Sequence, residues 1–137
     1  MSGRAFADTN ILIYAASDQS GEGKPELARA ALEATHVISV QVLNEFVNVT
    51  RNKLRQSWSE VSVALEAIEA AGLEVVPLTL ELHLAGRQIS QLHHLKIYDA
   101  CIVAAALEAG CDTLWSEDLQ AGRRFGDLTV RNPFEVA

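Results

Sequence analysis

The chain has 137 residues, of which 49% are hydrophobic and 21% charged, and its formal net charge is −7. This composition excludes a disordered chain, and the length suffices to bury a core, so we expect one domain over residues 1–137. No apolar run is long enough to span a bilayer, and the N-terminal MSGRAFADTN lacks the apolar core of a signal peptide. We therefore expect a cytoplasmic protein without membrane contact.

The cysteines argue against a zinc protein, and the negative charge limits how the chain could bind nucleic acid. Cys101 and Cys111 lie in no Cys/His cluster, so we expect reduced thiols and no zinc site. A nucleic-acid enzyme normally has a broad basic face. If this chain acts on nucleic acid, then the contact is local, a metal offsets the acidic site, or a basic partner takes part.

The first half of the chain alternates short apolar runs with longer runs of helical periodicity. We predict, in chain order, a strand, a surface loop, a helix, a second strand, a helix capped by Ser39, and a helix that opens on a capping box. The strands are placed at Arg4–Asp8 and Val37–Val40, and the loop at Ser17–Pro25. The helices are placed at Pro25–Ala34, at Val40–Lys53, and from Ser57–Glu60 to Gly72.

The second half continues the alternation with three strands and two helices. The strands are placed at Leu73–Val76, Thr113–Trp115 and Leu128–Arg131, and the helices at Thr79–His93 and Asp99–Ala109. The first of these helices should bury Leu82, Ala85, Ile89 and Leu92, which are three and four residues apart. The second is apolar on nearly every side and should be buried. The whole pattern predicts an α/β fold with a mainly parallel sheet covered on both faces.

Four acidic residues stand out against this pattern. Asp8 closes the first strand, and Asp118 follows the Thr113–Trp115 strand. Glu45 lies on the helix after the second strand, and Asp99 begins the buried helix. Because ligands bind beyond the carboxyl ends of parallel strands, we expect the four carboxylates to converge on one edge of the sheet.

Such a cluster needs a counter-charge, since neighbouring carboxylates repel one another. Mg²⁺ and Mn²⁺ prefer oxygen ligands, and one or two such ions could activate water and stabilise charge on a phosphodiester. Each acid also has an ordinary interpretation. Asp99 could complement a helix dipole, Asp8 and Asp118 could be turn or cap residues, and Glu45 could be a solvated helix residue.

At these residues the chain resembles the PIN-domain nucleases, in particular the VapC-like toxins of toxin–antitoxin pairs. The resemblance runs along essentially the whole chain and is carried by FADTNILIY (Phe6–Tyr14), ISVQVLNEFVNV (Ile38–Val49), YDACIVAAALEAGCDTLWSEDLQ (Tyr98–Gln120) and LTVRNPF (Leu128–Phe134). It implies a five-stranded sheet of order 3-2-1-4-5, with the first and fourth strands adjacent.

The resemblance also implies roles for individual residues. Asp8, Asp99 and Asp118 would form the metal-holding core, and Glu45 would complete the site as a ligand through water or by positioning the attacking water. Ser116 matches a Ser or Thr that the family often has near the fourth acid. Glu117 competes with Asp118 for that fourth place, and the family register favours Asp118. Apart from the resemblance, the position of Asn10 just after Asp8 suggests that it supports the site from outside the metal ligands or caps the next helix.

The activity implied is Mg²⁺- or Mn²⁺-dependent endonucleolytic cleavage of RNA. The resemblance further implies a homodimer that is inhibited by a cognate antitoxin, with DNA contacted only through that antitoxin. Arg51 and Lys53, at the end of the helix that carries Glu45, are candidate phosphate contacts or simply cations at a helix C-terminus. Lys96, close to Asp99 in sequence, is a further candidate substrate contact.

Other functions fit the residues less well. A haloacid-dehalogenase-type phosphatase needs a second Asp two residues after Asp8, where the chain has Asn10. A receiver domain needs an acidic pair near the first strand and a late Lys, and the chain has neither. A third alternative stays open, namely a non-catalytic metal-binding subunit that acts with a DNA-binding partner in operon autoregulation.

Overall fold

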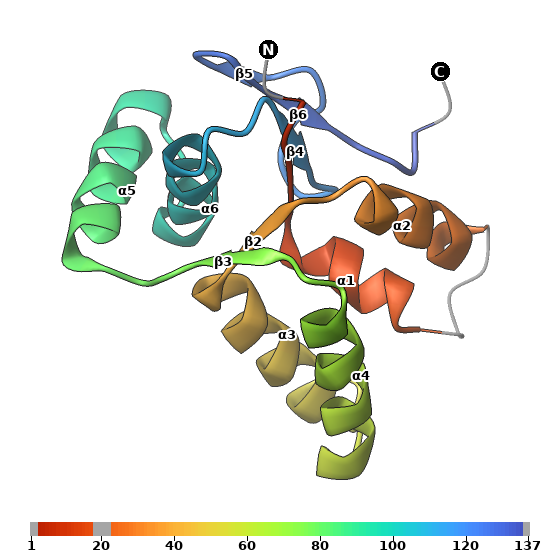
Figure 1. Ribbon diagram of the computed structural model, residues 1–137. Coiled ribbons are helices and arrows are strands. Elements are labelled where there is room, and N and C mark those ends of the chain that lie inside the picture. Colours follow the sequence, from red (N-terminus) through yellow and green to blue (C-terminus); the bar gives the residue numbers. More distant parts are fainter. Residues whose placement is uncertain (1–2, 18–22, 136–137) are drawn as a thin grey trace.

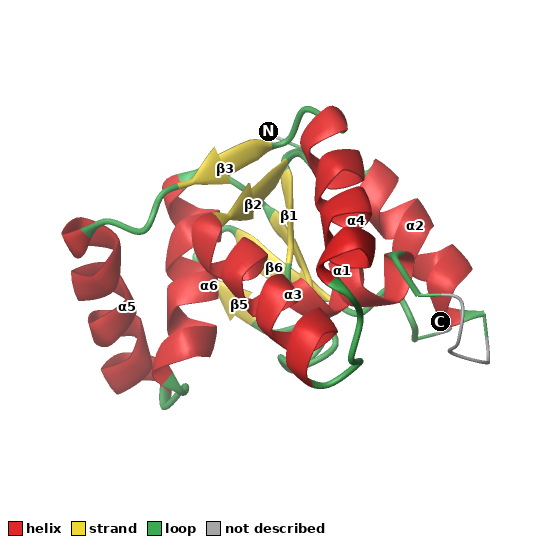
Figure 2. Ribbon diagram, turned by 90° about the horizontal axis from the view of Figure 1, so that it is seen from below, coloured by secondary structure: helices red, strands yellow, loops and turns green. Residues whose placement is uncertain are grey.

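A mainly parallel sheet runs through the computed structural model, which describes residues 3–17 and 23–135 (Figures 1 and 2). Its strand order is β3-β2-β1-β4-β6-β5, and every pairing is parallel except that of β5 with β6. The strands are β1 (Ala5–Ala7), β2 (Val37–Ser39), β3 (Glu74–Val76), β4 (Thr113–Trp115), β5 (Arg124–Phe125) and β6 (Leu128–Arg131). The α/β class and the order of the five predicted strands are confirmed, and β5 is an additional strand at the edge.

Strand β1 is central because all three of its residues are buried and both of its edges are paired. Phe6 lies opposite Val37 of β2 and Leu114 of β4. Both faces of such a strand must be covered, and an uninterrupted apolar run is the composition that this position requires. The pairing with β4 brings the ends of two segments more than 100 residues apart to the same sheet edge.

Helices cover the sheet on both sides. In Figures 1 and 2, α5 and α6 lie on one side of the strands and α1 and α2 on the other, while α3 and α4 extend past the carboxyl end of β2. The bounds are α1 (Thr9–Ala15), α2 (Lys24–Glu33), α3 (Val40–Asn52), α4 (Trp58–Ala70), α5 (Leu80–His93) and α6 (Ile97–Glu108). In the described part of the chain, no helix combines the length and apolar character that crossing a membrane requires.

Three local features differ from the sequence-based expectations. Helix α1 begins directly after Asp8, where no separate helix was predicted. Helix α6 begins at Ile97 rather than at Asp99, which lies in its first turn. Most of the predicted loop Ser17–Pro25 lies in residues 18–22, outside the described residues. Helix α2 starts at Lys24, one residue before its predicted start at Pro25.

The inward face of α5 also differs from the expected one. Leu82 is buried as predicted, but Ala85 and Leu92 are exposed, and Gly86 faces the interior instead. The reason is a close approach between α5 and α6, in which a Cβ placed on Gly86 would lie 2.5 Å from Cys101 Sγ. The expected burial of α6 is confirmed at Ala100 and over residues 102–106.

Candidate active site

Asp8 lies where β1 ends and α1 begins, and the residue is only 4% exposed. Oδ1 accepts a hydrogen bond from the Thr9 N–H at 2.7 Å, which makes Asp8 the N-cap of α1. Oδ2 accepts a hydrogen bond from Ser116 Oγ at 2.8 Å. The strand-to-helix junction therefore holds both carboxylate oxygens in place beneath the surface.

Ser116 connects Asp8 to the segment that follows β4. Its buried hydroxyl donates to Asp8 and accepts hydrogen bonds from the N–H groups of Asp118 at 3.2 Å and Leu119 at 3.3 Å. The turn that carries Asp118 is thus wrapped around the same oxygen that binds Asp8. This arrangement fits the supporting role expected for Ser116.

The four predicted acids lie close enough to perturb one another. Burial raises the pKa of Asp8 to about 7, the hydrogen bonds from Ser116 and Thr9 oppose that rise, and the charges of Asp118 and Glu45 add to it. Burial also raises the pKa of Asp99, with a further rise from Asp118 and an opposing effect of Lys96. The structure therefore brings Asp8, Glu45, Asp99 and Asp118 to one region, as the strand-end argument predicted.

The chemistry of this donor set fits a hard divalent cation. All four side chains offer carboxylate oxygens, which Mg²⁺ and Mn²⁺ prefer, and the charges of Asp118 and Glu45 add to the rise that burial causes in the pKa of Asp8. Over residues 3–17 and 23–135, no three Asp, Glu, His or Cys side chains are already gathered closely enough to enclose an ion.

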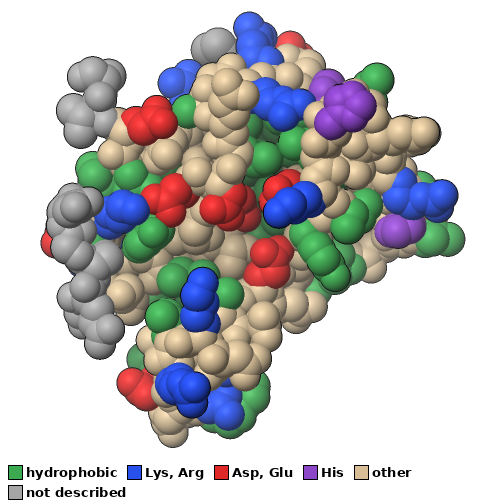
Figure 3. Space-filling model, turned by 180° about the vertical axis from the view of Figure 1, so that it is seen from behind, with side chains coloured by type: hydrophobic (Ala, Val, Ile, Leu, Met, Phe, Trp, Pro, Cys, Tyr) green, Lys and Arg blue, Asp and Glu red, His purple; other side chains and the backbone are tan. Residues whose placement is uncertain are grey.

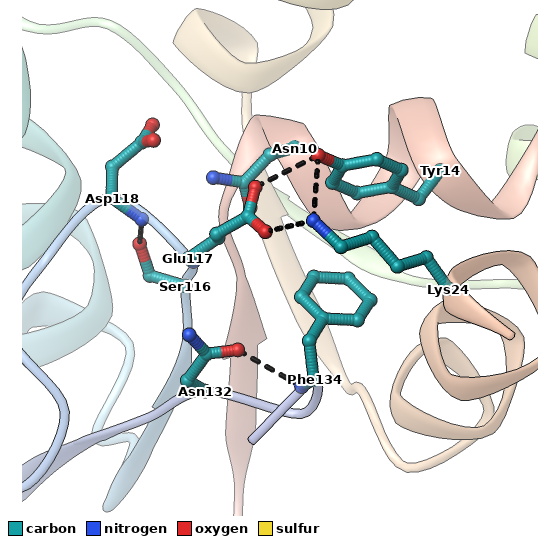
Figure 4. A network of polar contacts seen from close by, with 8 residues as sticks. All are labelled: Asn10, Tyr14, Lys24, Ser116, Glu117, Asp118, Asn132 and Phe134. Carbon is teal, nitrogen blue, oxygen red and sulfur yellow. Dashed lines mark hydrogen bonds and ion pairs between the residues drawn. The ribbon is translucent and has the colours of Figure 1, made fainter. Parts of the chain in front are cut away.

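Glu117, the rival of Asp118, belongs to a separate network (Figure 4). Its carboxylate accepts a hydrogen bond from Tyr14 at 2.9 Å and pairs with Lys24 Nζ at 2.7 Å. Lys24 Nζ also lies 4.8 Å from the centroid of the Tyr14 ring. In Figure 4 the Asp118 carboxylate points away from this network, so the two acids play different parts and Asp118 is the one that joins Asp8.

The other predicted site residues differ in how close they lie to the four acids. Asn10 lies beside the site, where its Oδ1 accepts the Glu117 N–H at 3.4 Å. Arg51 instead donates to the Gln56 carbonyl at 2.9 Å and stacks over the Trp58 ring, and Lys53 is an exposed residue just beyond α3. No contact of Arg51 or Lys53 with the four acids is found among the described residues, whereas Lys96 lies within electrostatic reach of Asp99.

Two residues that were not predicted from the sequence, Gln41 and Lys24, contact acidic side chains in this region. Gln41 is buried on α3 and hydrogen-bonds Glu45, its neighbour one helical turn later. The spacing of four residues between Gln41 and Glu45 was a readable signal, since such pairs meet on one helix face. Lys24 donates a hydrogen bond to Glu117, which is 93 residues away in the sequence, and no local sequence pattern predicts such a contact.

Glu45 also borders a groove of about 770 Å³ between α3, α5 and α6. The lining combines amide, aromatic and aliphatic side chains, among them Asn44, Asn48, Leu82, His83, Ile97 and Tyr98. Figure 3 shows Asp and Glu side chains gathered across the middle of one face of the molecule, with Lys or Arg beside them. The acidic site is therefore joined through Glu45 to a groove on the surface.

Known structures share this fold. A toxin–antitoxin complex from Klebsiella pneumoniae aligns with a TM-score of 0.72 at 24% identity, covering 96% of this chain and 99% of that one. VapC20 of Mycobacterium tuberculosis, described as a toxin that cleaves the sarcin–ricin loop, aligns with a TM-score of 0.66 at 16% identity, covering 83% and 91%. FitAB bound to a DNA fragment aligns with a TM-score of 0.69 at 17% identity, covering 97% of each chain.

A comparison with curated proteins yields no significant match. The model of the PIN domain, in contrast, matches residues 5–124, a range that contains β1, β4 and all four acids. That match spans most of the sequence and agrees with the strand order and the acidic edge described above. The chain belongs to the PIN-domain family.

Proposed function

We propose that the protein is a metal-dependent endoribonuclease that acts in the cytoplasm as the toxin of a toxin–antitoxin pair. The observation that carries this proposal is the meeting of Asp8, Glu45, Asp99 and Asp118 at the carboxyl edge of the sheet, with Asp8 buried and its pKa raised to about 7. Such a carboxylate cluster is unfavourable by itself and is what a phosphodiesterase needs in order to hold one or two divalent ions.

Each residue of the site has a proposed role in metal binding or catalysis. Asp8, Asp99 and Asp118 would hold the ion, and Glu45 would complete the site or orient the attacking water. A bound Mg²⁺ or Mn²⁺ supplies positive charge to the phosphate and lowers the pKa of water. Ser116 holds the Asp8 carboxylate and the Asp118 backbone in register through its hydroxyl. Lys96, beside Asp99, is the candidate contact for a substrate phosphate.

The partners proposed follow from the family and from the charge of the chain. The solved neighbours include toxin–antitoxin complexes, some of them bound to DNA. We assign this protein a cognate antitoxin, contact with DNA through that antitoxin, and assembly as a homodimer. A basic antitoxin segment would suit a chain of net charge −7, because an Arg can form paired hydrogen bonds with a carboxylate of the acidic site.

The test compares wild type with Asp99→Asn on labelled RNA, with and without Mg²⁺ or Mn²⁺. We expect cleavage by wild type that stops when the metal is chelated, and a loss of about 100-fold or more in Asp99→Asn because a proposed metal ligand is removed. Asp127→Asn is the matched control, since Asp127 is an exposed acid in the turn before β6. Equal rates for wild type and Asp99→Asn would contradict the proposal.

Expression in cells that lack the antitoxin, followed by mapping of new RNA 5′ ends, would identify the substrate. Growth arrest together with new 5′ ends is expected for wild type and not for Asp99→Asn. Metal binding and complex formation without any new 5′ ends would favour the alternative of a non-catalytic subunit of an autoregulatory complex.

A further inference from the structure

Gln41 occupies an unusual position for a polar side chain. It lies in the first turn of α3, is only 8% exposed, and its Nε2 donates two hydrogen bonds. One goes to Glu45 Oε1 at 2.8 Å, and the other goes to the backbone carbonyl of Tyr98 at 3.0 Å. The amide therefore joins two helices, since Glu45 belongs to α3 and Tyr98 to α6.

The direction of these bonds is fixed by chemistry. A backbone carbonyl can only accept, and an ionised carboxylate can only accept, so the group between them must offer two N–H donors. The NH₂ of a glutamine amide does so, and a carboxylate or a thioether in its place could not. The orientation of the amide thus follows from its partners.

The placement of the two partners connects the contact to the acidic site. Tyr98 immediately precedes Asp99, so a bond to its carbonyl holds the backbone from which the Asp99 side chain extends. The bond to Glu45 Oε1 limits the rotation of a flexible side chain at the other end. One buried amide therefore restrains both acids that come from α3 and α6.

A neutral donor suits this task better than a charged one. A Lys or Arg in the same place would pair with Glu45 and cancel the charge that a divalent cation requires. The glutamine amide holds the carboxylate and leaves its charge in place. In the described part of the chain, Glu45 Oε2 accepts no hydrogen bond, so that oxygen is available to a metal or to a water molecule.

We infer that Gln41 is a positioning residue, whose amide fixes the Glu45 carboxylate relative to the α6 turn that carries Asp99. This inference rests on the proposed function, because it assigns Glu45 a place in the metal site. It predicts that removal of the amide weakens metal binding and turnover through Glu45 and leaves the fold intact.

The test is Gln41→Met, which preserves helix propensity and approximate volume but cannot donate. We expect Mn²⁺ affinity, measured by titration calorimetry, to fall about 10-fold, the range typical of groups that orient metal ligands. The kcat for RNA at saturating Mn²⁺ should fall while KM changes little. Gln88→Met is the control, because it is the same substitution at an exposed glutamine of a helix, α5.

A structural role is separated from positioning by repeating the substitution in a Glu45→Ala background. If Gln41 acts through Glu45, then Gln41→Met should cause no further loss of Mn²⁺ affinity in that background. An equal loss in both backgrounds, or unchanged Mn²⁺ affinity in Gln41→Met alone, would overturn the inference. Gln41→Asn, which keeps an amide too short to span both partners, gives the same comparison should Gln41→Met fail to fold.

The calorimetry also separates this inference from the proposed function. Wild type that binds Mn²⁺ but cleaves no RNA would contradict the nuclease proposal, and the effect of Gln41→Met on Mn²⁺ binding would still decide the role of Gln41. Wild type that binds no Mn²⁺ would overturn both. Wild type that binds Mn²⁺ and cleaves RNA, beside an unaffected Gln41→Met, would overturn the inference alone.

Discussion

Asp8 ties the acidic site to the stability of the whole fold. Its pKa of about 7 in the folded chain compares with 3.8 for an exposed aspartate, and burial is the main cause. The folded protein keeps the Asp8 proton at a pH at which the unfolded chain has released it. The stabilisation from this proton is complete below pH 3.8 and is lost as the pH rises through about 7.

This linkage predicts an unusual pH profile for the metal-free protein. Between pH 5 and 7, Asp8 should lower the free energy of unfolding by about 1 kcal/mol per pH unit. Asp8→Asn, which keeps the shape and the capping oxygen, should therefore show a flatter profile and greater stability at pH 8. Urea denaturation of both proteins in a metal chelator measures the difference. Parallel profiles would show that Asp8 is ionised in the folded state throughout this range.

The candidate site could be predicted from the sequence only in part. Asp8 and Asp118 follow short apolar strands, so the strand-end rule places them correctly. Choosing Asp118 over Glu117 from sequence needed the family register, because the ion pair of Glu117 with Lys24 depends on how α2 packs. The basic residues Arg51 and Lys53 were proposed from their place at the end of the helix that carries Glu45, and their contact with a phosphate stays a prediction.

Helices and strands were predicted best where a local sequence pattern determines where they begin. The capping box of Ser57 and Glu60 starts α4 as expected, and Ser39 caps α3. Helix α1 escaped prediction because the run Ile11–Tyr14 is apolar and partly β-branched, which does not distinguish a helix from a strand. Strand β5 has two residues and exists through its pairing with β6, a contact that no local pattern encodes.

The contact between α5 and α6 shows how a small residue can determine an interface. Gly86 lets the two helices approach so closely that an added Cβ would lie 2.5 Å from Cys101 Sγ but 3.4 Å or more from the other nearest atoms. Periodicity of large apolar residues could not reveal this face, because the residue at its centre has no side chain. Ala85 and Leu92, which match the apolar spacing, are exposed for that reason.

This geometry predicts a conditional effect of Gly86→Ala. In the wild-type background the new methyl group meets the thiol, and the free energy of unfolding should fall by about 1–3 kcal/mol. In a Cys101→Ala background the thiol is gone, and Gly86→Ala should become neutral or stabilising by up to about 1 kcal/mol because alanine favours helices. Urea denaturation of the four proteins tests this. Equal destabilisation in both backgrounds would mean that the thiol is not the obstacle.

On the scale of the whole molecule, the exposed apolar residues are unevenly distributed. Leu78, just before α5, and Leu80 and Leu84, in its first turns, are all exposed, and Leu80 is 69% exposed. Leu78 also lines the groove that Glu45 borders. Isolated exposed leucines are common, but neighbouring ones indicate an interaction surface. If the proposed homodimer forms, this surface is where we expect its interface.

Leu80→Glu should therefore convert a dimer into a monomer. A charge placed in an apolar interface would be buried without a partner, which opposes association. Light scattering coupled to size-exclusion chromatography gives the molar mass of each form. Val63→Glu is the control, because Val63 is similarly exposed but belongs to α4. A wild type that is monomeric, or a Leu80→Glu protein that stays dimeric, would remove α5 from the interface.

The distribution of the four acids along the chain bears on how the protein is synthesised. Asp8 leaves the ribosome early and Asp118 late, and β4 must insert beside β1 before the two can meet. A nascent chain that has not yet emerged as far as Asp118 carries an incomplete set of carboxylates. If the proposed nuclease function holds, the nascent chain would therefore be unable to cleave RNA for most of its own synthesis.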